Sequence, residues 1–143
     1  VLCLAGMAAL WWSVPPRRAL WLGGLSGLSF FLVVLVWMRA IGELPEDPLV
    51  HEAVMAYASH YSLLESILRR HGEGWRTPGL RAASLDHAMW FHRPARADEW
   101  LLYAQHSPSA QGGRGLGIGR MFTAEGTLVA TVAQEGMLRI PDA

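Results

Sequence analysis

Three polar side chains lie where the sequence otherwise predicts buried strands. Ser84 and Asp86 fall within the strand-like residues 82–93, and Gln134 falls within residues 127–140, each among large apolar neighbours. A hydroxyl, carboxylate or amide buried without a partner costs about 1–3 kcal/mol, so such a group is either hydrogen-bonded or used. A hydroxyl and an amide can also orient a water molecule without changing charge. We therefore expect a functional site at these strands.

Two other arrangements of reactive side chains conflict with strand geometry. Ser84, Asp86 and His87 carry the groups of a nucleophilic triad, but they are nearly adjacent on one predicted strand, where alternation sends His87 to the opposite face. His87 and His92 are five residues apart and would also face opposite ways, and no cysteine lies nearby. We expect neither a triad nor a metal site.

Gly115, Gly117 and Gly119 occupy alternate positions of another predicted strand. Their spacing differs from GxGxxG and no helix follows, which argues against a phosphate-binding loop. Glycines at every second residue instead leave one face of a strand bare, so that another backbone can pack closely. We expect that neighbour to be a central helix.

One long amphipathic helix is predicted after Asp47. Asp47 is a good N-cap, Pro48 suits the first helical position, and Gly72 can adopt the left-handed conformation that ends a helix. Apolar residues repeat at spacings of three and four, as one face of a helix requires. They are Val50, Ala53, Val54, Tyr57, Tyr61, Leu64 and Leu68.

Strand-like runs stand on both sides of this helix in the sequence. One lies near residues 33–41, and four follow at about 82–93, 99–107, 115–123 and 127–140. Such a grouping places one helix against one antiparallel sheet, which is an α+β class. A helix of about two dozen residues is about 35 Å long, so the sheet must curl around it.

Composition excludes some classes of function. The 143 residues carry 12 basic and 12 acidic side chains, so the chain lacks the field that attracts nucleic acid or an anionic membrane. The single cysteine, Cys3, cannot form an internal disulfide, which fits a reducing compartment such as the cytoplasm. The length predicts one ordinary domain.

Residues 1–35 form an apolar segment that we leave unassigned. Arg17 and Arg18 are its only charges, and residues 19–38 are long enough to span a bilayer. Glycines and serines interrupt that run, and residues 30–36 are β-branched and aromatic, as strand residues are. A membrane anchor is the alternative to a cytoplasmic chain, and an artefact of the upstream sequence is a third interpretation.

Seven sequence blocks occur in an order that is found in one enzyme family. The blocks are residues 36–40 (VWMRA), 44–48 (LPEDP), 57–59 (YAS), 84–94 (SLDHAMWFHRP), 99–103 (EWLLY), 114–115 (RG) and 134–136 (QEG). In this part the chain resembles the second half of the bacterial and peroxisomal acyl-CoA thioesterase II family.

The resemblance implies a single hotdog fold, a curled antiparallel sheet around one long helix, over residues 36–143. It implies hydrolysis of fatty acyl-CoA thioesters to free fatty acid and coenzyme A, with no cofactor. Family members are similar to two hotdog domains fused in one chain, whereas this sequence has one. The expected partner, besides the acyl-CoA substrate, is therefore a second hotdog domain, either another copy in a homodimer or a missing N-terminal half.

The family's catalytic trio is an aspartate, a serine or threonine, and a glutamine. Block alignment assigns the glutamine to Gln134 and the hydroxyl to Ser84, while His60 occupies the place of the aspartate. An imidazole with an ordinary pKa near 6.5 is mostly neutral at neutral pH, so His60 could accept a proton there. If it does not, the site is weakened or inactive.

Arg93 and Arg114 flank loops and are candidates for binding the phosphates of coenzyme A. Two other functions stay open. One is a truncated, inactive hotdog half that only pairs with another hotdog or binds acyl-CoA. The other is a hotdog enoyl-CoA hydratase, although the aspartate and histidine motif of that family is not found.

Overall fold

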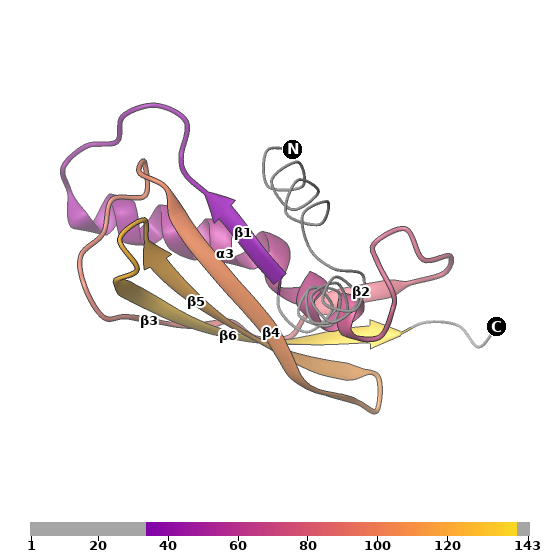
Figure 1. The fold of residues 1–143 in the computed structure, drawn as a ribbon. Coiled ribbons are helices and arrows are strands. Elements are labelled where there is room, and N and C mark those ends of the chain that lie inside the picture. Colours follow the sequence, from indigo (N-terminus) through magenta and orange to yellow (C-terminus); the bar gives the residue numbers. More distant parts are fainter. Residues whose placement is uncertain (1–33, 140–143) are drawn as a thin grey trace, which may run out of the picture. The chain divides into compact units, whose positions relative to one another are not determined.

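A computed structural model describes residues 34–139, which form one antiparallel sheet and one long helix (Figure 1). In chain order the elements are β1 (Val34–Met38), α3 (Pro48–Arg70), β2 (Arg81–Ser84), β3 (Ala88–Phe91), β4 (Leu101–Gln111), β5 (Arg114–Thr123) and β6 (Leu128–Arg139). The strands are hydrogen-bonded in the order β1-β4-β5-β6-β2, and β3 also pairs with β6. The predicted α+β hotdog fold is confirmed. The interpretations of residues 1–33 concern a segment outside the described residues.

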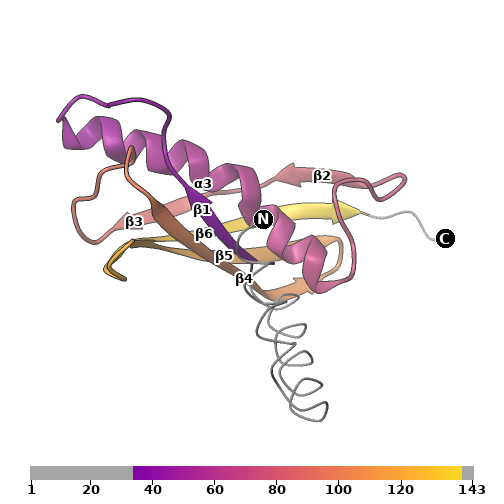
Figure 2. The same ribbon diagram turned by 45° about the horizontal axis from the view of Figure 1, so that its top comes forward.

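The ends of α3 follow the local signals of the sequence. The Asp47 carboxylate accepts the backbone N–H of Leu49 at 3.0 Å, which satisfies one of the free donors of the first turn. Beyond the last turn, Gly72 has a φ of 75°, the left-handed conformation that glycine adopts without strain. The 23 residues of the helix lie along one face of the sheet, as Figure 2 shows.

The face of α3 that meets the sheet differs in part from the predicted apolar face, of which Leu64 and Leu68 are buried as expected. Tyr57 and Tyr61 were expected to be buried, but they are 69% and 64% exposed and stack edge to face with each other. The residues turned toward the sheet instead include a row with a spacing of four: His51, Met55, Ser59, Leu63 and Ile67. Polar members are tolerated in this row because they are hydrogen-bonded, as when Ser59 Oγ donates to the carbonyl oxygen of Ala56.

Two of the three alternate glycines of β5 allow the predicted close approach of the helix. A Cβ atom on Gly117 would lie 2.9 Å from the carbonyl oxygen of Leu63, and one on Gly115 would lie 2.4 Å from Cγ2 of Ile67. Gly119 differs, because a Cβ there would meet the ring of Tyr103 at 2.3 Å. The bare strand face therefore accommodates the helix at one end and a buried ring at the other.

The predicted strand over residues 82–93 is in fact two short strands with a bulge between them. Ser84 pairs with Gly136 and Ala88 with Ala133, so four steps along one chain match three along β6. The extra residue shifts the alternation of side chains by one position. Ser84 and His87 consequently both face α3, and the prediction that His87 faces the opposite way is wrong.

Hydrogen bonds to Glu135 hold this bulge in place. The carbonyl oxygen of Glu135 accepts the N–H groups of Leu85 and Asp86, at 2.9 and 3.4 Å. The Asp86 carboxylate in turn accepts the Glu135 N–H at 2.7 Å. The polar residue that seemed out of place in a strand is therefore the one that anchors the interruption of the strand.

Residues 34–139 contain no helix that combines the length and the apolar character needed to cross a membrane. The alternative of an anchor at residues 19–38 rests mainly on residues outside that range, so it stays a prediction.

Candidate active site

The structure brings the three predicted site residues together from three elements. Gln134 of β6 is fully buried, and its Nε2 lies 2.6 Å from Oγ of Ser84, the last residue of β2. The same nitrogen lies 2.9 Å from Nδ1 of His60 on α3. The side chains meet although His60 is 74 residues and Ser84 is 50 residues from Gln134 along the chain.

The donor and the acceptor in each hydrogen bond of the trio follow from the neighbouring hydrogen bond. Ser84 donates its hydroxyl hydrogen to the carbonyl oxygen of Asp86 at 3.2 Å, so its oxygen can only accept from Gln134. The amide nitrogen of Gln134 therefore faces Ser84 and gives its second hydrogen to Nδ1 of His60. A neutral His60 then carries its ring proton on Nε2.

A second histidine lies beside the trio, and sequence reasoning missed it. Nε2 of His87 is 2.8 Å from Oγ of Ser59, a residue of α3. Because that hydroxyl donates to the Ala56 carbonyl oxygen at 2.7 Å, Nε2 of His87 must be the donor to Ser59. The ring centroids of His87 and His60 are 6.0 Å apart, with an angle of 66° between the ring planes. The sequence feature that could have revealed this position of His87 is Asp86, because a carboxylate within a strand pattern indicates an irregularity of the strand.

The surroundings of His87 favour its neutral form. Partial burial lowers the pKa of His87 below the ordinary value for histidine, and a positive charge on His60 lowers it further. The nearby Asp86 carboxylate acts in the opposite direction and only partly offsets these effects on the pKa. His87 therefore keeps a free lone pair at lower pH than an ordinary histidine does.

The site is open on one side. His60, Ser84 and His87 are exposed, whereas Gln134 is enclosed beneath them. All four residues of β2 are exposed, and large apolar side chains also reach solvent on α3, on β3 and in the bulge. They include Tyr57, Tyr61, Leu85 and Trp90.

The two arginines proposed for substrate binding lie at different ends of β6. Arg93 donates to the carbonyl oxygen of Leu128 at 2.9 Å. Arg114 pairs in register with Met137, and its guanidinium is 3.8 Å from the Glu135 carboxylate. At about 3.4 Å per residue, these ends of the strand are roughly 30 Å apart. The structure therefore does not bring the two arginines together.

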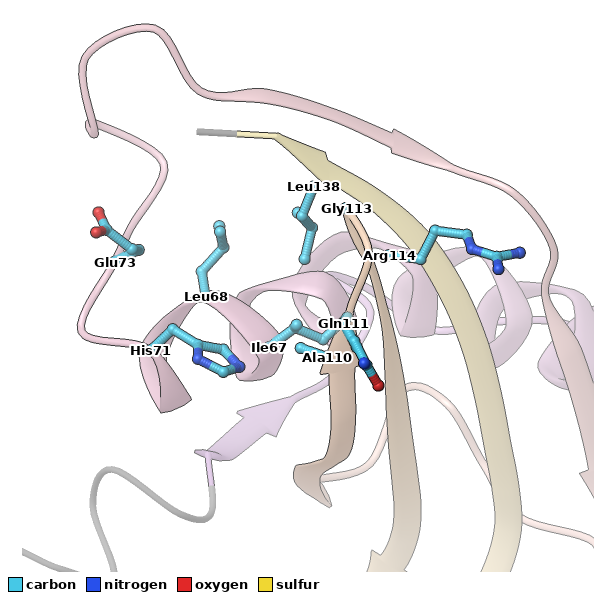
Figure 3. Close-up of a pocket in the computed structure, with 9 residues that line it drawn as sticks. All are labelled: Ile67, Leu68, His71, Glu73, Ala110, Gln111, Gly113, Arg114 and Leu138. Carbon is cyan, nitrogen blue, oxygen red and sulfur yellow. The ribbon is translucent and has the colours of Figure 1, made fainter. Parts of the chain in front are cut away.

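A separate cavity of about 190 Å³ lies at the C-terminal end of α3. Figure 3 shows Ile67, Leu68 and Leu138 around it, while the guanidinium of Arg114 extends away from it. None of the trio lines this cavity. Within the described part of the chain, no group of three or more histidine, cysteine or acidic residues could hold a metal ion.

Comparisons with known proteins agree with the resemblance seen in the sequence. A family model described as acyl-CoA thioesterase matches residues 28–137. Among curated proteins, the chain is 38% identical over 106 residues to acyl-CoA thioesterase 2 of Haemophilus influenzae, covering 74% of this chain and 37% of that protein. It is 45% identical over 107 residues to mouse acyl-coenzyme A thioesterase 8, covering 74% of this chain and 33% of the relative. The chain thus spans about a third of the length of these relatives.

A solved structure gives the same relationship in three dimensions. The acyl-CoA thioesterase II TesB2 from Mycobacterium marinum superimposes with a TM-score of 0.72 at 50% sequence identity. The match covers 78% of this chain and 43% of the other. The predicted resemblance to the second half of a two-domain thioesterase is confirmed.

Proposed function

This chain belongs to the acyl-CoA thioesterase family, and we propose that it hydrolyses acyl-CoA thioesters to a free acid and coenzyme A. The observation that carries the proposal is the contact of one buried amide, Gln134, with both Ser84 and His60. The cluster lies at a solvent-open edge and contains a hydroxyl, an amide and an imidazole. These groups can hold a water molecule against a thioester carbonyl.

In this proposal the trio has a positioning and electrostatic role. The hydrogen bonds of Gln134 hold the Ser84 hydroxyl and the His60 imidazole in one orientation, so little reorganisation is needed when the water attacks. With Nδ1 occupied by Gln134, His60 has an N–H on Nε2 to offer to the developing oxyanion. Neither Ser84 nor Gln134 has to change its charge.

We also propose that a second hotdog domain covers the open side of the site. The chain spans only about a third of its curated relatives, and β2 is an edge strand with every residue exposed. The exposed Tyr57, Tyr61 and Trp90 would be buried by such a partner. The partner is either a second copy or another hotdog half, and the single cysteine favours a cytoplasmic location.

Arg114 and Arg93 are proposed contacts for the coenzyme A phosphates. Arg114 is nearer along β6, since its register partner Met137 is three residues from Gln134. Its guanidinium is 63% exposed and only loosely paired with Glu135, so it can reorient toward a phosphate. Arg93 is engaged with the Leu128 carbonyl oxygen, which makes it the weaker candidate.

The test is release of free thiol from octanoyl-CoA by the 143-residue chain. We expect thiol release by the wild type and a loss of about 10²–10³-fold in kcat for Gln134→Ala. The matched control is Gln105→Ala, a fully buried glutamine of β4 on the other side of β5. Binding of acyl-CoA without thiol release would support the inactive half instead, and hydration of crotonyl-CoA without thiol release would support the hydratase.

A further inference from the structure

The two imidazoles of the site differ in whether their lone pair is engaged. Nδ1 of His60 accepts a hydrogen bond from Gln134, so its lone pair is occupied. His87 donates from Nε2 to Ser59, which places the lone pair of the neutral ring on Nδ1. Among residues 34–139, no hydrogen bond is made to that Nδ1 atom. His87 is therefore the imidazole with a lone pair free to take a proton.

We propose that His87 is the general base of this site and that His60 donates a hydrogen bond to the oxyanion of the substrate. The inference rests on the proposed thioester hydrolysis and assigns the proton transfer within it. It reverses the assignment that the position of His60 in the sequence suggests. It also gives a function to a histidine that faces α3 only because of the bulge between β2 and β3.

The spacing of the rings suits this division of roles. The ring centroids are 6.0 Å apart, so the two imidazoles are neighbours at one site. Ser59 is fully buried and fixes His87 from the helix side, while the Asp86 anchor fixes the backbone just before it. The ring is exposed, so water and substrate can reach it.

The reaction proceeds in two steps, attack of water on the thioester and loss of the thiolate. Nδ1 of His87 takes a proton from water as the water oxygen bonds to the thioester carbonyl carbon, and the π electrons of the carbonyl move to its oxygen. The Nε2–H of His60 donates to that oxyanion. The carbonyl then re-forms, the carbon–sulfur bond breaks, and the imidazolium of His87 gives its proton to the departing thiolate. The products are the acid and coenzyme A, and His87 is neutral again.

The charged groups around His87 are compatible with this cycle. His60 faces it from α3, and Asp86 lies beside it in its own segment. A neutral His60 does not repel the imidazolium that forms, and the Asp86 carboxylate stabilises it. Because burial and His60 lower the pKa of His87, activity should persist below the ordinary pKa of histidine and fall at more acid pH.

Glutamine substitutions separate a base from a hydrogen-bond donor. His87→Gln and His60→Gln both keep an N–H donor, but neither side chain can take a proton. With octanoyl-CoA, we expect His87→Gln to lower kcat by about 10²–10⁴-fold and to abolish the acid limb of the pH–rate profile. His60→Gln should retain the acid limb. The control is His92→Gln, since His92 is also bonded to a hydroxyl, Thr131, and should leave the profile unchanged.

Several results would overturn the assignment. Loss of the acid limb in His60→Gln with its retention in His87→Gln would make His60 the base, and a wild-type rate in His87→Gln would remove His87 from the chemistry. If His87→Gln does not fold, ¹⁵N titration of the wild-type histidine rings gives a second test. The midpoint of the acid limb must then match the titration of His87 and not that of His60. A wild type that releases no thiol would instead defeat the proposed hydrolysis itself.

Discussion

Two buried glutamines lie on opposite sides of the central strand β5, and both bond to the central helix. Gln105 of β4 and Gln134 of β6 are each fully buried, and each leaves its Oε1 without a partner in the described structure. Gln105 donates to Oγ of Ser62 at 2.6 Å, as Gln134 donates to His60. Burial and contact with the helix therefore do not distinguish the two glutamines.

What differs is the set of groups to which each amide is joined. Gln105 bonds to one helix hydroxyl. Gln134 joins an imidazole to the hydroxyl of Ser84, on a strand at the exposed edge of the sheet, with His87 beside them. On this difference rests the proposal that Gln134, and not Gln105, belongs to the active site.

The largest expected effect separates the two glutamines by activity. Gln134→Ala should lower kcat by about 10²–10³-fold, because it removes the donor that holds both His60 and Ser84. Gln105→Ala should leave kcat unchanged. Gln105→Ala loses one hydrogen bond and Gln134→Ala loses two, so the expected destabilisation is about 1 kcal/mol for the first and about 2 kcal/mol for the second. Octanoyl-CoA kinetics and urea unfolding measure the two effects, and equal losses of kcat would remove the proposed distinction.

A second comparison uses the glycine that pairs with each glutamine. Gln134 is in register with Gly117 and Gln105 with Gly119. Alanine at either glycine should destabilise the fold by about 1–3 kcal/mol, because the new Cβ meets the Leu63 carbonyl oxygen or the Tyr103 ring. Only Gly117→Ala should also lower kcat, since it displaces α3 close to His60. Thermal unfolding and kinetics test this, and unchanged stability in both variants would contradict the observed close packing.

The two serines provide a smaller contrast. Ser84→Ala should lower kcat about tenfold, which corresponds to the loss of one hydrogen bond worth roughly 1.4 kcal/mol. Ser62→Ala removes the equivalent partner of Gln105 and should not change kcat. A matching decrease in both variants would mean that the hydroxyls act only through packing.

The smallest expected effect is a pair of opposite shifts in pH dependence. Activity requires neutral His87, so the acid limb of the pH–rate profile follows the pKa of His87. Because a charge on His60 lowers that pKa, His60→Gln should move the limb to higher pH. Because the Asp86 carboxylate raises the pKa, Asp86→Asn should move the limb to lower pH while keeping an acceptor for the Glu135 N–H. Profiles measured at low salt test both shifts, and shifts of the same sign would argue against His87 as the titrating group.

Local patterns in the sequence were enough to predict one long helix against a curled antiparallel sheet and to single out Ser84 and Gln134. The Asp47 cap, the terminal Gly72 and the alternate glycines of β5 each require only near neighbours to be interpreted, and the structure agrees with them except at Gly119. The meeting of His60, Ser84 and Gln134 followed from the family resemblance.

The tertiary structure decided which faces those elements present. Tyr57 and Tyr61 fit an apolar helical face but are exposed, because the sheet packs on the row that contains Ser59. His87 reaches the site because one extra residue is accommodated between β2 and β3 when both pair with β6. Alternation is a property of a single strand, whereas register belongs to a pair of strands. A one-residue bulge therefore becomes visible only when the partner strand is in place.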